Sequence, residues 1–336
     1  MKNTKLWITM VLFMLLFAYL CGASAENRVD NMDMPIVQIP DSVIEIEDEA
    51  YMNTAVQIVY LPDTCKKIGS RAFANCSQLI RVEIPSDDIE IADDAFEGSP
   101  NVVLVKNDTG GAMITPEPHT GMQQISVTLL DGSSVACWLY CPEATSANSG
   151  LIVYLHGGSG KGNDLNLITE ADGFPQYLLS GQLGALSSYV LIPQLPKELK
   201  GWIDMDVTLM DMIQVVSKSC GINVADISLT GHSMGGTGAW SLAVAHPDFF
   251  ARVAPLSGSI RNTPENVRAL KNMPVYAFVG TEDTIVKPES SIAFVEALTT
   301  AGGNAKIVEI EGADHFDVPR SAYLGNYGLI EWLQGS

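Results

Sequence analysis

From about residue 122 to the C-terminus, short and nearly continuous apolar runs alternate with longer segments of helical periodicity. Strands are predicted at residues 125–130, 135–141, 151–155, 189–193, 227–230, 253–256, 275–279 and 306–310, and helices at residues 204–220, 236–245, 289–301 and 322–333. Asp131-Gly132 is predicted to form the turn of a hairpin between the first two strands. Apolar runs without alternation are typical of strands buried on both faces. The pattern therefore predicts an α/β domain with a mainly parallel sheet, covered by helices on both faces.

A different pattern, with a period of 22 to 23 residues, occupies residues 35–105. An aliphatic residue followed by proline recurs at Ile39-Pro40, Leu61-Pro62 and Ile84-Pro85. Such a period is typical of a solenoid, in which each unit buries its apolar face only against its neighbours. The pattern resembles the leucine-rich repeats of bacterial surface-antigen type, with about three units. The resemblance implies a binding or adhesion surface, and a simple spacer is the equally weighted alternative.

The first 25 residues have the features of a secretion signal. Two lysines precede an apolar stretch at residues 6–20, and Ala23-Ser24-Ala25 provides a small-residue cleavage site. The apolar stretch is short for a membrane span. The predicted organisation is a signal peptide at 1–25, leucine-rich repeats at 35–105, a linker at 106–121 and a catalytic domain at 122–336.

Net charge and cysteine content argue against a nucleic-acid-binding protein and against a disulfide-stabilised fold. The formal net charge is −20, from 39 acidic and 19 basic residues, and this acidic balance argues against a nucleic-acid partner. Five cysteines remain after the predicted signal cleavage, an odd number that does not imply a disulfide framework. Among Cys65, Cys76, Cys137, Cys141 and Cys220, we expect Cys137 and Cys141 to be packed thiols, and the repeat resemblance implies a buried, structural Cys76.

The pentapeptide Gly231-His232-Ser233-Met234-Gly235 lies between a predicted strand and a predicted helix. A nucleophilic serine on a sharp strand-to-helix turn needs glycines beside it, because bulkier residues would crowd the turn. The same turn aims the Met234 backbone N–H at a developing oxyanion. Ser233 is therefore the predicted nucleophile, and Met234 is a predicted oxyanion donor.

This strand-turn-helix pentapeptide resembles the nucleophile turn of the α/β-hydrolases, and that resemblance implies that nucleophile, acid and histidine follow one another in this order along the chain. Asp283 follows the strand at 275–279, and His315 follows the strand at 306–310. We expect His315 to be the general base and Asp283 to orient it. Elimination supports the histidine, because the others lie in the linker, at a strand end, beside the serine or before a proline (His119, His156, His232 and His246). Glu282 is an adjacent competitor, and the resemblance favours Asp283 over it; Asp314 and Asp317 also compete but flank the histidine closely in sequence.

The glycine-rich segment 156–160 is predicted to provide the second oxyanion donor, because glycines let backbone N–H groups approach a substrate oxygen. We expect that donor to be Gly158 ahead of Ser159. Trp202 and His232 are candidate substrate-pocket residues, and a packed loop anchor is the alternative for Trp202. The connection from 157 to 188 contains no predicted amphipathic helix of the kind that covers a lipase site.

Several of these segments together resemble an α/β-hydrolase of the secreted esterase, polyhydroxyalkanoate depolymerase and predicted peptidase group. The matching segments are 155–160, 230–236, 245–250, 254–258, 279–283 and 312–315. The resemblance spans the whole second domain. It implies an α/β-hydrolase fold that carries a Ser-His-Asp triad.

The sequence thus predicts a secreted or cell-surface serine hydrolase that cleaves carboxylic esters through an acyl-enzyme. Its expected substrate is a small or carbohydrate-linked ester, and a surface ligand of the repeats is a further candidate partner. Two alternatives stay open: a serine peptidase on the same triad, or a repeat-mediated binding protein with a vestigial hydrolase domain. We expect no metal, no cofactor and no membrane span after signal cleavage, since no metal-ligand spacing or nucleotide-binding loop is present.

Overall fold

The computed structural model describes residues 36–335 except 41, 87, 101, 107–112, 116, 130–131, 146–148 and 172. The predicted signal peptide, part of the predicted linker and Asp131 of the predicted hairpin turn lie outside the described residues. The chain divides into two compact units, Met1–Gly110 and Gly111–Ser336. Each unit is described by itself.

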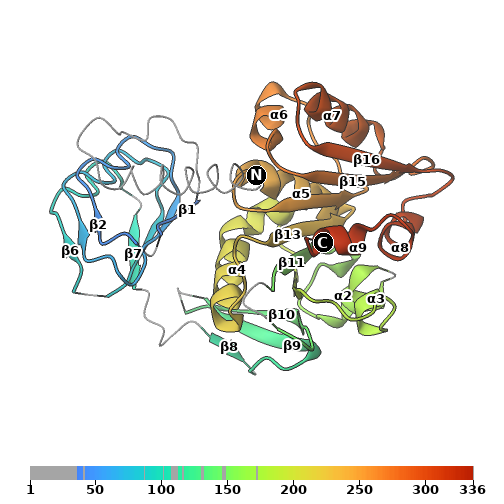
Figure 1. The fold of residues 1–336 in the computed structure, drawn as a ribbon, viewed down its shortest axis with the longest axis horizontal. Coiled ribbons are helices and arrows are strands. Elements are labelled where there is room, and N and C mark those ends of the chain that lie inside the picture. The colour runs from blue at the N-terminus through green and yellow to red at the C-terminus, as the bar shows by residue number, and fades with distance from the viewer. Residues whose placement is uncertain are drawn as a thin grey trace, which may run out of the picture. The chain divides into compact units, whose positions relative to one another are not determined.

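The first unit is a solenoid with a parallel strand ladder on each of two sides (Figure 1). Its four-stranded sheet has the order β1 (Ile36–Gln38), β3 (Ile58–Tyr60), β5 (Arg81–Ile84) and β7 (Val103–Lys106). Its three-stranded sheet has the order β2 (Glu45–Ile46), β4 (Lys67–Ile68) and β6 (Glu90–Ile91). Aromatic rings from successive repeats stack inside: Tyr51 on Phe73 at 5.2 Å, and Phe73 on Phe96 at 5.6 Å between ring centroids. The repeat period of the sequence therefore becomes a stack of equivalent core positions.

A nine-stranded sheet organises the second unit. Its order is β16 (Ala305–Ile310), β15 (Val275–Gly280), β14 (Arg252–Leu256), β13 (Ile227–His232), β11 (Leu151–Leu155), β12 (Tyr189–Pro193), β10 (Ser134–Cys141), β9 (Gly121–Thr128) and β8 (Met113–Thr115). The strands from β16 to β12 run parallel, while β10, β9 and β8 pair antiparallel to their neighbours. The sheet is thus mainly parallel, and the carboxyl ends of β13, β15 and β16 meet at one edge.

Helices cover both faces of this sheet (Figure 1). Contacts connect α4 (Asp206–Cys220), α5 (Met234–Ala245), α6 (Pro264–Leu270) and α7 (Glu289–Thr300) in a layer on one face, with the 3-10 turn η2 (Trp202–Met205) between α4 and α5. The other layer contains α2 (Asn166–Glu170), α3 (Phe174–Leu179), α8 (Asp317–Leu324) and α9 (Leu329–Leu333). Buried side chains of α3, α8 and α9 share one core cluster with β11, β12, β14 and β15. The α/β-hydrolase arrangement predicted from the sequence is present.

Several segments differ from the prediction, among them α6, a helix that the apolar pattern did not predict. The expected helix at 322–333 is two helices, because the chain leaves helical geometry at Gly325 and reaches a left-handed φ of 65° at Gly328. Within the segment predicted as linker, β8 pairs with β9 as the edge strand of the large sheet. The connection between residues 157 and 188 contains α2 and α3, two short helices that the apolar pattern did not predict. Phe174 and Tyr177 of α3 are fully buried, so α3 is part of the core.

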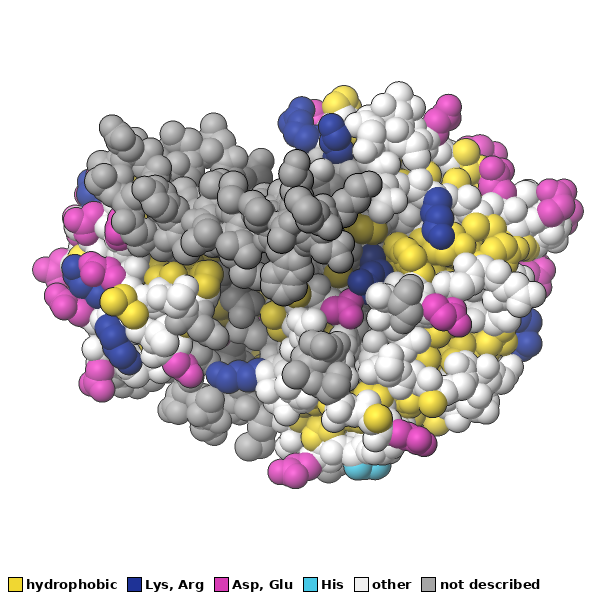
Figure 2. Space-filling model, viewed as in Figure 1, with side chains coloured by type: hydrophobic (Ala, Val, Ile, Leu, Met, Phe, Trp, Pro, Cys, Tyr) yellow, Lys and Arg dark blue, Asp and Glu magenta, His cyan; other side chains and the backbone are white. Residues whose placement is uncertain are grey.

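The surface and the thiols agree with the composition. Acidic side chains recur over the visible face of both units in Figure 2. Cys65, Cys76, Cys137, Cys141 and Cys220 are all unpaired thiols. Among the described residues, no helix is both long and apolar enough to cross a membrane.

Candidate active site

Ser233 lies on a sharp turn between β13 and α5. Its backbone adopts φ 60° and ψ −118°, a strained combination for a residue with a side chain. A Cβ on Gly235 would overlap the carbonyl oxygen of Leu155 in β11, and one on Gly231 would come within 2.6 Å of the same atom. The two glycines are therefore required by the close approach of the turn to the neighbouring strand, as the pentapeptide predicts.

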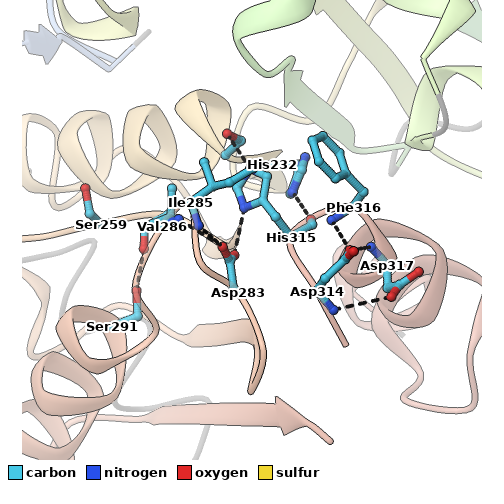
Figure 3. Close-up of polar contacts among 12 residues, drawn as sticks. His232, Ser259, Asp283, Ile285, Val286, Ser291, Asp314, His315, Phe316 and Asp317 are labelled. Carbon is cyan, nitrogen blue, oxygen red and sulfur yellow. Dashed lines mark hydrogen bonds and ion pairs between the residues drawn. The ribbon is translucent and has the colours of Figure 1, made fainter. Parts of the chain in front are cut away.

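The Ser233 hydroxyl belongs to a continuous chain of hydrogen bonds. It donates to Nε2 of His315 at 2.8 Å, and Nδ1 of His315 donates to Oδ2 of Asp283 at 2.7 Å. The links to Asp283 are drawn in Figure 3. His315 and Asp283 are 4% and 6% exposed, so water is largely excluded from the bond between them. The structure thus brings together the three residues that chain order predicts as nucleophile, base and acid.

Asp283 is held on both carboxylate oxygens. Its Oδ1 accepts from the backbone N–H groups of Ile285 and Val286, each at 2.9 Å, while Oδ2 faces His315 (Figure 3). Burial acts to raise the pKa of Asp283, but the hydrogen bonds from His315 and from the two backbone N–H groups outweigh it and lower the pKa. Asp283 is therefore ionised and fixed, which suits the partner of an imidazole that gains charge during a reaction.

The competing carboxylates take other positions. Glu282 is exposed. Asp314 accepts from the backbone N–H groups of Phe316 and Asp317 at 2.8 and 3.1 Å, and Asp317 accepts from the N–H of Asp314 (Figure 3). These two carboxylates stabilise the turn that follows His315.

The two predicted oxyanion donors each begin a helix. Met234 is the first residue of α5, and Gly158 is the first residue of the 3-10 turn η1 (Gly158–Gly160). An N–H at the start of a helix has no partner inside that helix, and it lies at the positive end of the helix dipole. The segments adjoin, because a Cβ on Gly157 would lie 3.5 Å from Cβ of Ser233 and one on Gly158 would lie 3.7 Å from Cε of Met234. The arrangement can present two backbone donors beside the serine.

The His156 side chain holds this glycine segment in place through two hydrogen bonds. Its Nδ1 donates to the carbonyl of Gly157 at 2.6 Å, and its Nε2 accepts from the Leu195 N–H at 2.9 Å. Burial lowers its pKa to about 4, so the ring is neutral near pH 7. The sequence pattern predicts no role for the His156 side chain. A histidine that closes a buried strand immediately before two glycines is the only sequence signal for this support.

Trp202 is a core anchor, and its prediction as a pocket residue is wrong. Its side chain is 1% exposed, its indole N–H donates to the carbonyl of His156 at 3.1 Å, and its ring contacts the His156 ring edge-on at 4.9 Å. A Cβ on Gly238 of α5 would meet the Trp202 ring. The side chain therefore fills the space between the helix that follows Ser233 and the glycine segment, and leaves no face for a substrate.

His232, the other predicted pocket residue, contacts the loop that carries His315. Its Nε2 donates to the backbone carbonyl of His315 at 2.9 Å, and the two imidazole centroids are 4.6 Å apart. Burial, and then the neighbouring His315, lower the pKa of His232 to about 4. His232 is therefore a neutral donor at the edge of the site. Among the described residues, no group of three or more His, Cys, Asp or Glu side chains could hold a metal ion.

Family models match both units. Residues 29–109 match a BspA type leucine rich repeat region, and residues 197–323 match the dienelactone hydrolase family. The second match contains Ser233, Asp283 and His315. The two matches agree with the solenoid and with the α/β sheet described above.

Two curated proteins are similar to parts of the chain. "Putative esterase NocK" from Nocardia uniformis subsp. tsuyamanensis is 28% identical over 160 residues, which cover 46% of this chain and 45% of NocK. The non-reducing polyketide synthase Preu3 from Preussia isomera is 40% identical over 77 residues, or 22% of this chain and 3% of the synthase. The chain thus spans less than half the length of these curated relatives.

Solved structures share the fold of the second unit. A thermostable esterase is 25% identical with a TM-score of 0.53, covering 63% of this chain and 62% of that one. A puromycin hydrolase mutant is 15% identical with a TM-score of 0.50, covering 66% and 40% of the two chains. The first unit therefore resembles a BspA-type leucine-rich repeat region, and the second resembles an α/β-hydrolase of the dienelactone hydrolase type.

Proposed function

We propose that this chain is a secreted serine hydrolase that cleaves carboxylic esters, with Ser233 as nucleophile, His315 as general base and Asp283 as the carboxylate that orients it. The observation that carries the proposal is the continuous hydrogen-bond chain from the Ser233 hydroxyl through His315 to Asp283, at 2.8 and 2.7 Å. The esterase neighbours support ester hydrolysis.

In the first half of the reaction, Ser233 Oγ attacks the carbonyl carbon of the ester while Nε2 of His315 takes the hydroxyl proton. The carbonyl oxygen gains a negative charge in the tetrahedral intermediate. The backbone N–H groups of Met234 and Gly158 stabilise this charge. When the C–O bond to the leaving group breaks, His315 returns the proton to the departing alkoxide, so that an alcohol leaves and the acyl group stays on Ser233.

In the second half, water replaces the alcohol. His315 takes a proton from water, the resulting hydroxide attacks the acyl carbon, and the proton returns to Ser233 Oγ as the carboxylic acid leaves. Asp283 stays ionised throughout and stabilises the imidazolium that forms in each half. No step uses a metal or a cofactor.

The substrate is proposed to be a small or carbohydrate-linked ester. Helices α2 and α3 lie in the connection where a lipase lid would be expected, but α3 is packed into the core through Phe174 and Tyr177. This packing disfavours a mobile cover for long acyl chains. We assign the leucine-rich repeats an accessory binding role outside the cell, in keeping with the signal-like first 25 residues.

Hydrolysis of p-nitrophenyl acetate by the purified wild type and by Ser233→Ala tests this function. We expect the wild type to exceed the spontaneous rate by several orders of magnitude and Ser233→Ala to fall near that rate. Equal rates for the two proteins would overturn the proposal. A panel of acetylated sugars, feruloyl esters and short peptides would then separate an esterase from a peptidase on the same triad.

A further inference from the structure

The contact between His232 and His315 bears on how the triad is held together. Ser233 and His315 are 82 positions apart in the chain and lie on separate segments, the turn after β13 and the loop after β16. Their hydrogen bond is productive only if both segments keep their relative position. A displacement of about 1 Å between reacting groups can lower a rate by about two orders of magnitude.

A direct link connects the two segments outside the triad. His232 is the residue before Ser233. Its side-chain Nε2–H donates to the backbone carbonyl of His315 at 2.9 Å. The bond engages the main chain of His315, so both ring nitrogens of His315 remain available for Ser233 and Asp283. The link therefore holds the catalytic histidine without competing for its proton transfer.

The two imidazole rings also pack against each other. Their centroids are 4.6 Å apart and their planes are tilted by 43°. The flat His232 ring limits rotation of the His315 side chain on that side. Asp314, the residue before His315, holds the following turn through the N–H groups of Phe316 and Asp317, as Figure 3 shows.

We propose that His232 is a positioning residue: through the hydrogen bond from its Nε2–H to the His315 carbonyl, and through ring packing, it fixes the catalytic histidine relative to the serine next to it. The inference rests on the proposed serine-hydrolase function. It accounts for an imidazole at the position before the nucleophile, where substrate contact alone would not require a donor aimed at the main chain of the histidine loop.

Glutamine and asparagine at position 232 provide a matched test. The glutamine side-chain nitrogen is as many bonds from Cβ as Nε2 of histidine, so His232→Gln can keep the donor in place. The asparagine nitrogen is one bond shorter, so His232→Asn cannot reach the carbonyl. His232→Phe keeps a ring and removes the donor. His119 is exposed and lies in the segment before β9, so His119→Phe controls for the loss of a histidine as such.

Two measurements apply to each folded variant: kcat and KM on p-nitrophenyl acetate, and the second-order rate of phosphonylation by a fluorophosphonate. Phosphonylation needs the aligned serine and histidine but no particular ester. We expect His232→Asn and His232→Phe to lose about 10- to 100-fold in kcat and in phosphonylation rate. KM should stay within about 3-fold, and His232→Gln should keep most of both rates.

Three results would overturn the inference: wild-type kcat in His232→Asn and His232→Phe, a change confined to KM, or an equal loss in His232→Gln and His232→Asn. If His232→Phe does not fold, the Gln and Asn pair decides alone. Failure of the proposed function is a separate outcome, because the wild type itself would then show no Ser233-dependent hydrolysis.

Discussion

Nε2 of His156 accepts a hydrogen bond from the backbone N–H of Leu195, 2.9 Å away, while Nδ1 of the same ring donates to the Gly157 carbonyl. One neutral imidazole thus joins the end of β11, the segment after β12 and the first residue of the glycine turn beside Ser233. The ring is 3% exposed, so neither bond is readily replaced by water.

Replacing His156 by asparagine should therefore destabilise the protein and slow the reaction. The amide of His156→Asn can still donate to Gly157, but the buried Leu195 N–H loses its acceptor. An unsatisfied buried donor costs about 1–3 kcal/mol in the free energy of unfolding. Chemical denaturation measures this loss, and kcat should fall as well because the glycine turn is less fixed. Wild-type stability and kcat in this variant would contradict the assigned support.

The same residue should contribute to acid sensitivity. A histidine in an unfolded chain has a pKa of about 6.5, whereas burial lowers that of His156 to about 4. Below about pH 6.5 the unfolded state therefore binds a proton that the folded state does not bind. The stability contribution of His156 is complete above that pH and is lost as the pH falls toward 4. The loss is about 1.4 kcal/mol per pH unit.

Denaturation of the wild type and of His156→Asn at pH 7 and pH 5 checks this. Other groups titrate in both proteins, so the informative quantity is the difference in pH dependence between them. The free energy of unfolding should fall more steeply in the wild type. Parallel pH dependence of the two proteins would show that His156 has an unshifted pKa.

Gly235→Ala tests the close packing of the serine turn. The added Cβ would overlap the Leu155 carbonyl oxygen, so α5 would have to move away from β11 and carry Ser233 with it. We expect a loss of several kcal/mol in stability, or no folded protein. Gly201→Ala is the matched control, because a Cβ there meets nothing within 4 Å and the backbone has a φ of −161°. Equal stability of the two variants would contradict the packing described for the turn.

Asp283→Asn should lower kcat strongly while it changes the free energy of unfolding little. The amide cannot stabilise an imidazolium, and it favours the wrong tautomer of His315. The loss in kcat is expected to reach about four orders of magnitude. Glu282→Gln, one residue away and exposed, should keep kcat within about 3-fold. A larger loss in Glu282→Gln than in Asp283→Asn would transfer the acid role to Glu282.

The sequence predicts the sheet of the second unit well because its strands are nearly continuous apolar runs. The runs at 151–155 and 189–193 coincide with β11 and β12. Helices α2 and α3 have only 5 and 6 residues, too few for a helical period to emerge, and they form by packing against the sheet. The break between α8 and α9 depends on the backbone at Gly325 and Gly328. The spacing of apolar residues, from which the helix is predicted, does not include these two glycines.

The candidate triad can be predicted from chain order because each member follows a strand of the parallel sheet. The contacts around the triad cannot be predicted in this way. Trp202 could have been a pocket residue or a buried anchor, and only the packing of η2 against α5 decides between them. The bond from His232 to the His315 carbonyl joins a side chain to a main-chain atom 83 residues away, so no residue type at position 315 encodes it.

The most direct test is to identify the residue that a covalent serine-hydrolase inhibitor modifies. The wild type is treated with a fluorophosphonate, digested and mapped by mass spectrometry, with Ser233→Ala and His315→Ala as controls. We expect a single adduct on the peptide that contains Ser233, no adduct in Ser233→Ala, and a greatly slowed reaction in His315→Ala. An adduct on another serine, or undiminished labelling of Ser233→Ala, would contradict the central claim that Ser233 is the nucleophile.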